Sequence, residues 1–329
     1  MEPESAFPLL APPAPCPGCG GASRRPLHVF ALNHRKPRAT RQAKLAVLGC
    51  EACGTSAVHP LPSDGELADY YGGDAGWDVR VDERPEAVAP RLERLHASHA
   101  RNLELVTRHV QLPLGEERAA LDFGCGIGGW LDALAAAGWR TSGIEPGRRA
   151  AAVASRRHRL LERIPDRPTF DLVVVHHTLE HLRDPGDVLR RLATALSPGG
   201  AIWISVPNAE RLGEHRDIDY MWSDKHLCAF TTAALESLLA RAGIEVAAAS
   251  RDGWELPLSP KRLVVVGRKA GAGPPQPERP LEPLLAALRA YGATLRDPVE
   301  AVAQQHGRRS RIAGVVRRLR PRRFSQGRS

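Results

Sequence analysis

From residue 119 to residue 242, two patterns of apolar and polar positions alternate along the chain. Short, mainly apolar runs bounded by turn residues are typical of strands buried on both faces, and they are 119–123, 170–175 and 201–206. The segment 140–144, between two helical patterns, is predicted as a further strand. Segments with apolar residues every three or four positions predict helices, and they are 129–137, 147–157, 185–196 and 231–242. Repeated strand–helix units with short connections predict an α/β fold in which helices cover both faces of a parallel sheet.

Further elements flank this region. A helical pattern at 91–110 precedes it. Strands at 244–250 and 261–266 follow it, and the segment RDGWELPLSP between them favours an antiparallel pair. The stretch 208–226 is polar and irregular, and we expect it to form a lid over the substrate.

Four of the six cysteines form two pairs, Cys16-Pro-Gly-Cys19 and Cys50-Glu-Ala-Cys53, and a glycine follows each pair. A gap of two residues lets both thiolates of a pair reach one ion, and two pairs supply the four sulfur ligands of a zinc ribbon. Because four sulfurs leave no open coordination position, the predicted zinc is structural. Two disulfides or free thiols are the competing interpretation, which an intracellular chain disfavours.

The glycine-rich segment LDFGCGIGGW follows the strand at 119–123 and begins the next helix. That position suits a nucleotide-binding loop, since glycines let the chain turn sharply and let a ligand approach the backbone. Gly124, Gly126 and Gly128 fit one spacing, and a dinucleotide spacing that ends at Gly129 fits equally well. In either case Glu145, which ends the next strand, can accept hydrogen bonds from both ribose hydroxyls.

The segment FDLVVVHHTLEHL contains His177, Glu180 and His181 in the H-x-x-E-H spacing of one class of zinc metalloproteases. Such a protease holds both histidines one turn apart on a helix. Here the segment follows a buried parallel strand, and ligand sites in such sheets lie just beyond the carboxyl ends of the strands. This position disfavours the protease interpretation and predicts that His176 and His177 line a cofactor crevice.

Three segments together resemble class I S-adenosylmethionine-dependent methyltransferases: the glycine segment continued to SGIEPG, the segment from FDLVVVHHTLEHLRDP to ISVPN, and the closing strand pair that ends in LVVVGRK. The resemblance covers residues 90–270, and the cysteine pairs narrow it to the bacterial type with an N-terminal zinc-binding module. Asp122, the LEHLRDP segment and the terminal strand pair separate the chain from a dehydrogenase. The resemblance implies a Rossmann-like sheet, parallel with a terminal antiparallel strand, preceded by a small zinc ribbon.

The resemblance also implies S-adenosylmethionine as the cofactor. The glycine loop would then hold its methionine part, Asp122 would order the loop or bind the amino group, and Glu145 would bind the ribose. The adenine contact would be Leu161 or Glu162.

A methyltransferase needs a base only when the acceptor is a hydroxyl or a carbon acid, and an imidazole near its ordinary pKa suits that proton. His181 is the first candidate for this base, with Glu180 orienting the ring or the substrate. His226, in the irregular stretch, is the second candidate. An equally weighted alternative is that Glu180 and His181 only cap and pack the helix that begins at Pro185.

The net charge of +9 belongs to the C-terminal end, because residues 301–329 hold nine arginines and no lysine or acidic residue, so that residues 1–300 sum to zero. Within this tail, Ile312, Val315 and Leu319 recur at helical spacing and predict a short basic amphipathic helix. Residues 308–323 would then suit an anionic membrane surface or nucleic acid. A solvated or disordered tail is the simpler interpretation.

The predicted division is a zinc-ribbon module at 1–65, a linker at 66–90, a methyltransferase domain at 91–270, and a linker with a basic helical tail at 271–329. No apolar run approaches the eighteen or so residues of a membrane span, so we expect a cytoplasmic protein. The expected reaction is methyl transfer to a small molecule, such as a sugar or a specialised or cell-envelope metabolite. The alternatives are an RNA methyltransferase that uses ribbon and tail, an NAD-dependent dehydrogenase, and a non-catalytic cofactor-binding protein.

Overall fold

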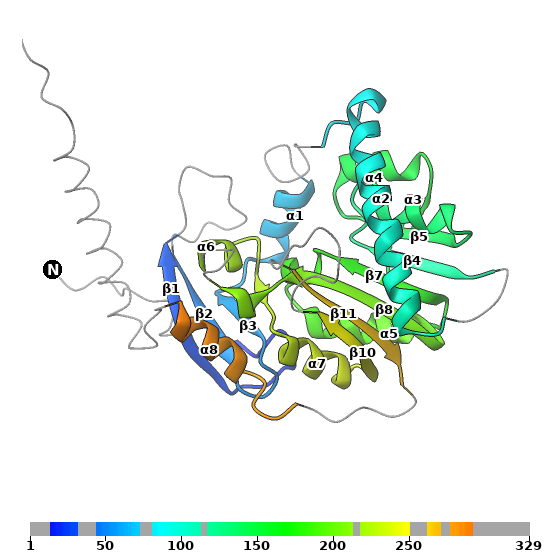
Figure 1. The fold of residues 1–329 in the computed structure, drawn as a ribbon. Helices are drawn as coiled ribbons and strands as arrows, with labels where there is room; N and C mark the ends of the chain where they lie inside the picture. The colour runs from blue at the N-terminus through cyan, green and yellow to red at the C-terminus, as the bar shows by residue number, and fades with distance from the viewer. Residues whose placement is uncertain are drawn as a thin grey trace, which may run out of the picture.

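Figure 1 shows a computed structural model of the chain, which describes residues 14–31, 44–72, 81–112, 117–212, 218–250, 262–270 and 277–291. These residues form a sheet of seven strands and a sheet of four strands. The basic segment 308–323, and the helix expected in it, lie outside the described residues. Within the described ranges, no helix is long and apolar enough to cross a membrane.

The seven-stranded sheet has the strand order β10-β11-β8-β7-β4-β5-β6. Its strands are β4 (Ala119–Phe123), β5 (Arg140–Ile144), β6 (Arg159–Leu160), β7 (Phe170–His176), β8 (Leu196–Pro207), β10 (Ile244–Ser250) and β11 (Arg262–Lys269). Strand β11 is antiparallel to β8 and β10, while the pairs from β8 to β6 are parallel. The predicted Rossmann-like sheet with an antiparallel strand near one edge is thus confirmed.

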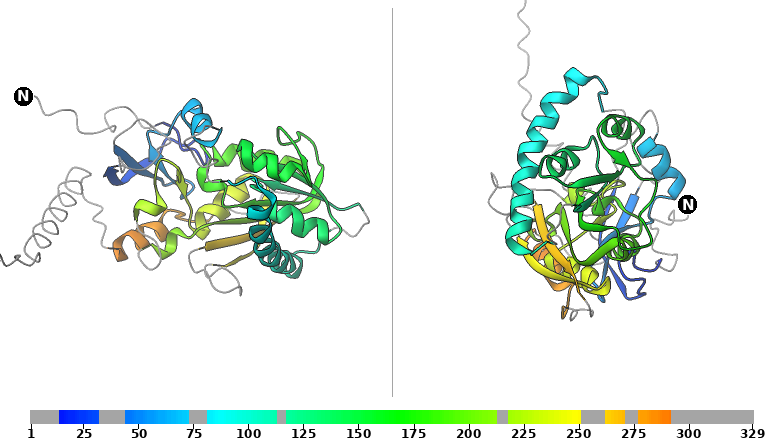
Figure 2. Two further views of the ribbon diagram at one scale, coloured as in Figure 1. Left: turned by 90° about the horizontal axis from the view of Figure 1, so that it is seen from above. Right: turned by 90° about the vertical axis from the view of Figure 1, so that its right-hand side faces the viewer.

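Helices cover both faces of this sheet (Figure 2), as the alternation of strand side chains requires. Val173 and Val175 of β7 join one core with the residues of α5 and α7, whereas Leu172 and Val174 join a second core with those of α2 and α3. The helices of this part of the chain are α2 (Pro85–His109), α3 (Gly129–Ala136), α4 (Arg148–Ser155), α5 (Pro185–Ala195) and α7 (Thr232–Arg241).

The four-stranded sheet contains the cysteine pairs and has the strand order β1-β2-β3-β9. Its strands are β1 (Arg24–Ala31), β2 (Lys44–Cys50), β3 (Ser56–His59) and β9 (Cys228–Ala229), and all neighbours are antiparallel. The first three strands belong to the N-terminal part of the chain, which we call the ribbon. The fourth comes from the far end of the irregular stretch that was expected to form the substrate lid.

The ribbon and the part of the chain that forms the large sheet share one continuous hydrophobic core. It extends from Leu45 and Val47 of the ribbon to α5, α7 and one face of the large sheet. Helix α8 (Glu282–Ala290), which lies beside β1 and β2 in Figure 1, adds Leu284 and Leu288 to the same core. The backbones also approach closely, because Gly186 donates to the carbonyl of Pro17 at 3.3 Å.

The remaining elements are α1 (Asp64–Gly72), the 3-10 turns η3 (Leu179–His181) and η4 (Ala209–Arg211), and α6 (Ile218–Met221). The segment 66–90, expected as a linker, contains most of α1 and the beginning of α2. Helix α1 has no buried residue and a weak apolar pattern, so its sequence carries little helical signal. The division into domains stays a prediction.

Candidate active site

The site lies where the strand order of the large sheet reverses. In chain order the strands run from β4 outward through β5 to β6, and then continue with β7 and β8 on the other side of β4. Ligands of such sheets bind beyond the carboxyl ends of the strands at this reversal. The loop after β4 and the turn after β7 meet there, because a Cβ at Gly124 would overlap the side chain of Thr178.

The glycine loop has the backbone conformation that its sequence predicts. Gly124, Gly126 and Gly128 have φ angles of 82°, 53° and 93°, in the left-handed region that favours glycine. The amides of Gly124 and Cys125 both donate to the carbonyl of Ile144, at 2.8 and 3.1 Å. These bonds hold the loop against the end of β5 and leave its outer side to a ligand.

Glu145 is tied directly to this loop. Its Oε2 accepts a hydrogen bond from the Gly126 amide, and its Oε1 accepts one from the Gly147 amide, both at 2.8 Å. Each carboxylate oxygen can accept a second hydrogen bond. Glu145 is therefore held against the loop by two backbone amides.

Asp122 lies at the base of the loop with an exposed fraction of only 2%. Burial, followed by the charge of Glu145, raises the pKa of its carboxyl well above the ordinary value. Its Oδ1 has no hydrogen-bond partner within the described part of the chain. A buried acceptor without a partner is costly, so Asp122 fits a site whose ligand donates a hydrogen bond there.

A second group of side chains braces the loop from the side of α3 and α4. Asp132 Oδ1 accepts hydrogen bonds from His158 Nε2 at 2.7 Å and Arg157 Nε at 3.0 Å. Arg157 Nη2 in turn donates to the carbonyl of Ile127 at 3.0 Å. The sequence analysis missed this brace, since nothing in the local pattern links residues 25 positions apart.

His176 belongs to an aromatic cluster. The ring of His99 stacks on Trp130 with centroids 4.7 Å apart, and its edge meets His176 at 5.1 Å. Burial, followed by the charge of His177, lowers the pKa of His176 well below the ordinary value. His176 is therefore a neutral ring that packs against α2 and α3.

His177, Glu180, His181 and His226 form a second cluster beside the loop. His177 directly follows β7 and has a φ angle of 51°, and its Nδ1 lies 3.2 Å from Glu180 Oε1. One donor atom each of Glu180, His181 and His226 lies within 4.8 Å of the other two. Glu180 is 1% exposed, and its Oε2 has no hydrogen-bond partner among the described residues.

Backbone carbonyls fix the tautomer of two of these rings. His181 Nδ1 lies 2.9 Å from the carbonyl oxygen of Lys225, and His226 Nδ1 lies 2.7 Å from that of Tyr220. A carbonyl only accepts hydrogen bonds, so Nδ1 carries the proton in both rings. The Nε2 atom of each neutral ring therefore has the lone pair, as a base or a metal ligand requires.

Burial sets the charges in this cluster. It lowers the pKa of His226 to about 4, with the charge of His181 acting in the same direction. Burial also lowers the pKa of His181. Burial alone would raise the pKa of Glu180, but the hydrogen bond from His177 and the charge of His181 lower it to about 2. At neutral pH the Glu180 side chain is therefore a carboxylate, and the rings of His181 and His226 are neutral.

The metalloprotease interpretation fails on geometry. His177 is not helical, and only Leu179–His181 form a single 3-10 turn. A metal ion could instead be held by Glu180, His181 and His226, the second of the two donor groups found within the described residues. That set does not contain His177.

The first donor group is formed by Cys16, Cys19, Cys50 and Cys53. The Sγ atoms of Cys16 and Cys53 lie 3.6 Å apart, as do those of Cys19 and Cys50. A tetrahedral zinc ion with Zn–S bonds of about 2.3 Å needs S···S edges of about 3.8 Å. The four sulfurs thus fit the ion without a large rearrangement, and no pair of them is bonded as a disulfide.

Two tyrosines complete the surroundings of the histidines. The hydroxyl of Tyr71, at the end of α1, lies 3.0 Å from His181 Nδ1, and the ring of Tyr220 meets the edge of His226 with centroids 4.9 Å apart. The sequence analysis did not single out either residue. Both occur in irregular polar stretches, and only the fold brings them to the turn after β7.

Fold and site together define a class I, Rossmann-like, S-adenosylmethionine-dependent methyltransferase domain. Residues 86–249 match the sequence model of a family described as "Methyltransferase domain". This part of the chain is therefore a methyltransferase domain, as the resemblance predicted.

Among curated proteins, the ubiquinone biosynthesis O-methyltransferase of Aeromonas salmonicida is 30% identical over 158 residues, which cover 41% of this chain and 64% of that protein. The protein of the same name from Albidiferax ferrireducens is 31% identical over 147 residues, 40% of this chain and 53% of that protein. The chain thus spans less than two thirds of the length of these relatives. An amino pentose methyltransferase from Micromonospora echinaspora, a solved structure, is 16% identical with a TM-score of 0.43, over 58% of this chain and 99% of that one.

Proposed function

We propose that this protein transfers the methyl group of S-adenosylmethionine to a small molecule that loses a proton in the reaction. The observation that carries the proposal is the meeting of two sites at the reversal of the sheet. The glycine loop with Glu145 adjoins the turn that carries Glu180 and His181. The first is suited to a cofactor and the second to an acceptor.

The cofactor residues follow from the contacts. The amides of the glycine loop would face the methionine part, Glu145 would accept hydrogen bonds from the ribose, and the unpartnered Oδ1 of Asp122 would accept one from the amino group or from the loop it orders. His177 would border the same crevice, since it directly follows β7. When bound, the cofactor supplies an electrophilic methyl group.

His226 is the base that the geometry favours, with His181 and Glu180 as its partners. Its Nδ1–H donates to the carbonyl of Tyr220, and among the described residues no hydrogen bond to its Nε2 competes with a substrate. The Nε2 of His181 instead lies 3.9 Å from Glu180 Oε1. The Glu180 carboxylate can thus stabilise the imidazolium that forms when His226 takes the acceptor proton. This reverses the order in which the sequence ranked the two histidines.

The acceptor class follows from this arrangement. A base beside the methyl group is useful for a hydroxyl or an acidic carbon, and an amine that reacts through its lone pair does not need it. The names of the curated relatives, O-methyltransferases of ubiquinone biosynthesis, support an acceptor oxygen. Sugars and specialised or cell-envelope metabolites carry such hydroxyls, and nothing within the described ribbon favours RNA.

The direct test is ligand binding followed by turnover. S-adenosylmethionine and S-adenosylhomocysteine should raise the thermal unfolding midpoint of the full chain, whereas NADH should not, because a ligand stabilises only the fold that binds it. A cell extract separated into small molecules, lipids and RNA, with a labelled methyl group, should show label in a small-molecule fraction. Stabilisation by NADH alone, label in the RNA fraction, or binding without transfer to any fraction would each refute the proposal.

We also propose that the four cysteines hold a structural zinc ion. The purified protein should contain about one zinc ion per chain, and Cys50→Ser should reduce this to near zero, because three thiolates hold the ion much more weakly than four. Mass spectrometry of the metal content measures both values. Cys125→Ser is the matched control, since Cys125 is also buried but lies in the glycine loop. A wild-type protein without zinc, or with two disulfides, would contradict this assignment.

A further inference from the structure

The segment that carries His226 is held by the ribbon and not by the domain to which it belongs in sequence. Strand β9, which begins two residues after His226, pairs with β3, so that Cys228 faces Ala57 and Ala229 faces Ser56. The amide of Val58 in β3 also donates to the carbonyl of Leu227 at 2.9 Å. The residue next to His226 is therefore fixed to the ribbon.

One side chain of the ribbon joins both ends of this segment. The hydroxyl of Ser56 donates to the carbonyl of Ala229 at 3.0 Å and accepts a hydrogen bond from Trp222 Nε1 at 3.1 Å. Ser56 is completely buried, and Trp222 is 1% exposed. In the low-dielectric interior such a hydrogen bond is strong, and leaving either partner without one costs free energy of folding.

Between these two anchors the chain forms a tight turn. The hydroxyl of Ser223 accepts hydrogen bonds from the amides of Lys225 and His226, at 3.2 and 3.0 Å. The ring of His226 is held at Nδ1 by the Tyr220 carbonyl. With both ends tied to Ser56, the turn has little freedom to change the direction of the His226 ring.

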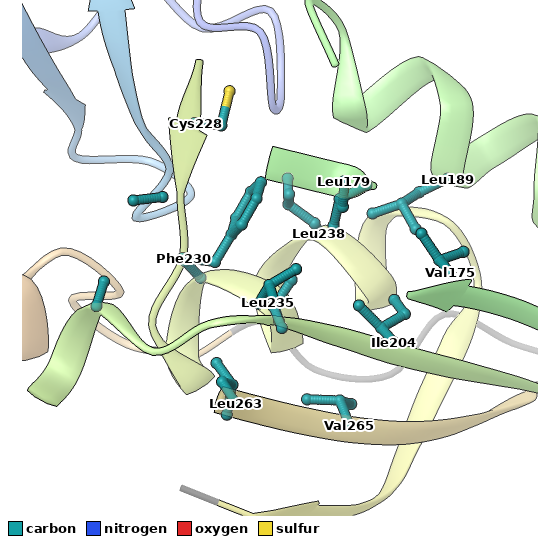
Figure 3. Close-up of a cluster of buried hydrophobic side chains, with 14 of the residues drawn as sticks. Val175, Leu179, Leu189, Ile204, Cys228, Phe230, Leu235, Leu238, Leu263 and Val265 are labelled. Atoms are coloured by element: carbon teal, nitrogen blue, oxygen red, sulfur yellow. The ribbon is translucent and has the colours of Figure 1, made fainter. Parts of the chain in front are cut away.

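The strand is also anchored by packing. Figure 3 shows Cys228 and Phe230 of this segment with the apolar side chains of the shared core, which include Leu179 and Leu238. Leu179 precedes Glu180 in the 3-10 turn. The same core thus supports both the strand that follows His226 and the turn that carries Glu180.

We propose that the ribbon positions the catalytic base: Ser56 on β3 fixes the segment 222–229 and thereby holds His226 at the acceptor site. Ser56 is a positioning residue, because it acts through Trp222 and the backbone of Ala229 and does not touch the reacting atoms. It follows Cys53 by three positions, so the second cysteine pair directly precedes the strand that holds the base. This inference rests on the proposed role of His226 in methyl transfer.

The test uses the full-length chain with Ser56→Ala, Trp222→Phe and the double variant. Both single changes remove the hydrogen bond between Trp222 and Ser56, and Ser56→Ala also removes the one to the Ala229 carbonyl. Each should lower kcat roughly 10- to 100-fold, as expected for a displaced catalytic group. The Kd for S-adenosylhomocysteine and the zinc content should stay at the wild-type values. Because Ser56→Ala already removes the hydrogen bond that Trp222→Phe removes, the double variant should be no slower than the slower single variant. Ser23→Ala is the matched control on the ribbon, where the hydroxyl donates to the exposed carboxylate of Glu51.

A second readout does not depend on turnover. Diethyl pyrocarbonate modifies neutral imidazoles, and peptide mass spectrometry gives the rate at His226 in each variant. Ser56→Ala and Trp222→Phe should raise this rate several-fold, while Ser23→Ala should not.

If the wild type transferred no methyl group, the proposed function would fail, yet the modification rate at His226 would still test the positioning. The positioning role of Ser56 would be overturned if both single variants kept the wild-type kcat and the wild-type modification rate. It would also be overturned if the effects on kcat multiplied in the double variant. If Ser56→Ala lost its zinc, Trp222→Phe would be the deciding variant, because Trp222 is distant in sequence from the cysteines.

Discussion

Replacing His226 with alanine should lower kcat for methyl transfer roughly 10²- to 10⁴-fold, the usual contribution of a positioned base, with no change in the Kd for S-adenosylhomocysteine. The effect falls on kcat because His226 is proposed to contact the acceptor, whereas Glu145 and the glycine loop are proposed to hold the cofactor. Steady-state kinetics and isothermal titration calorimetry measure the two quantities. His96→Ala, on the exposed side of α2, is the matched control and should keep full activity. A His226→Ala enzyme with wild-type kcat would remove the residue from the mechanism.

The dependence of kcat/KM on pH provides a second test of His226 as the base. Burial disfavours the imidazolium and lowers the pKa of His226 to about 4. A base acts in its deprotonated form, so kcat/KM should stay level as the pH falls from 8 to about 5 and decline only as it approaches the lowered pKa. An acid limb near the ordinary imidazole value of about 6.5 would contradict this environment. A second metal equivalent whose removal abolished activity would make Glu180, His181 and His226 ligands and would refute the role of His226 as a base.

Replacing Gly124 with alanine should weaken S-adenosylhomocysteine binding by about tenfold or more. Two effects add: the φ angle of 82° costs an alanine about 1–2 kcal/mol, and its Cβ would overlap Thr178 of the facing turn. The loop and the turn after β7 must therefore separate, and both belong to the proposed site. Calorimetric titration gives the Kd.

Gly138 provides the matched control for this change. Its φ angle is 81°, almost the same as that of Gly124, but a Cβ there would have no atom within 4 Å. Gly138→Ala should lower the thermal midpoint through backbone strain and leave the Kd for S-adenosylhomocysteine unchanged. Equal binding losses in the two variants would mean that strain in the fold, and not the contact with Thr178, controls the site.

The proposed cofactor side of the site could be predicted from the sequence because its signals are local. A glycine loop between a strand and a helix needs only neighbouring residues, and Glu145 ends the next strand. The cysteine pairs are equally local, since a gap of two residues reflects the geometry of one metal knuckle. The large sheet followed from the alternation of apolar runs and helical periods, with errors mainly at the ends of elements, such as the early beginning of α2 at Pro85.

The proposed acceptor side of the site was harder to predict from the sequence, because its residues meet only through long-range contacts. Tyr71 and His181 are 110 positions apart, and the brace of Asp132 and His158 spans 26. The pairing of β9 with β3 joins residues 173 positions apart through a strand of two residues, too short to have a periodic pattern. No local rule predicts such a pairing.

By itself, then, the sequence determined the class of fold, the conformation of the glycine loop and the cluster of four cysteines, because each depends on signals that are local along the chain. The tertiary structure decided how the two histidines differ. The carbonyls of Lys225 and Tyr220 fix the same tautomer in both rings, but the Nε2 of His181 lies 3.9 Å from Glu180 Oε1. It also decided that the ribbon and the methyltransferase domain share a core. The physical reason is that burial and hydrogen-bond partners are set by contacts between distant segments, which exist only once the chain has folded.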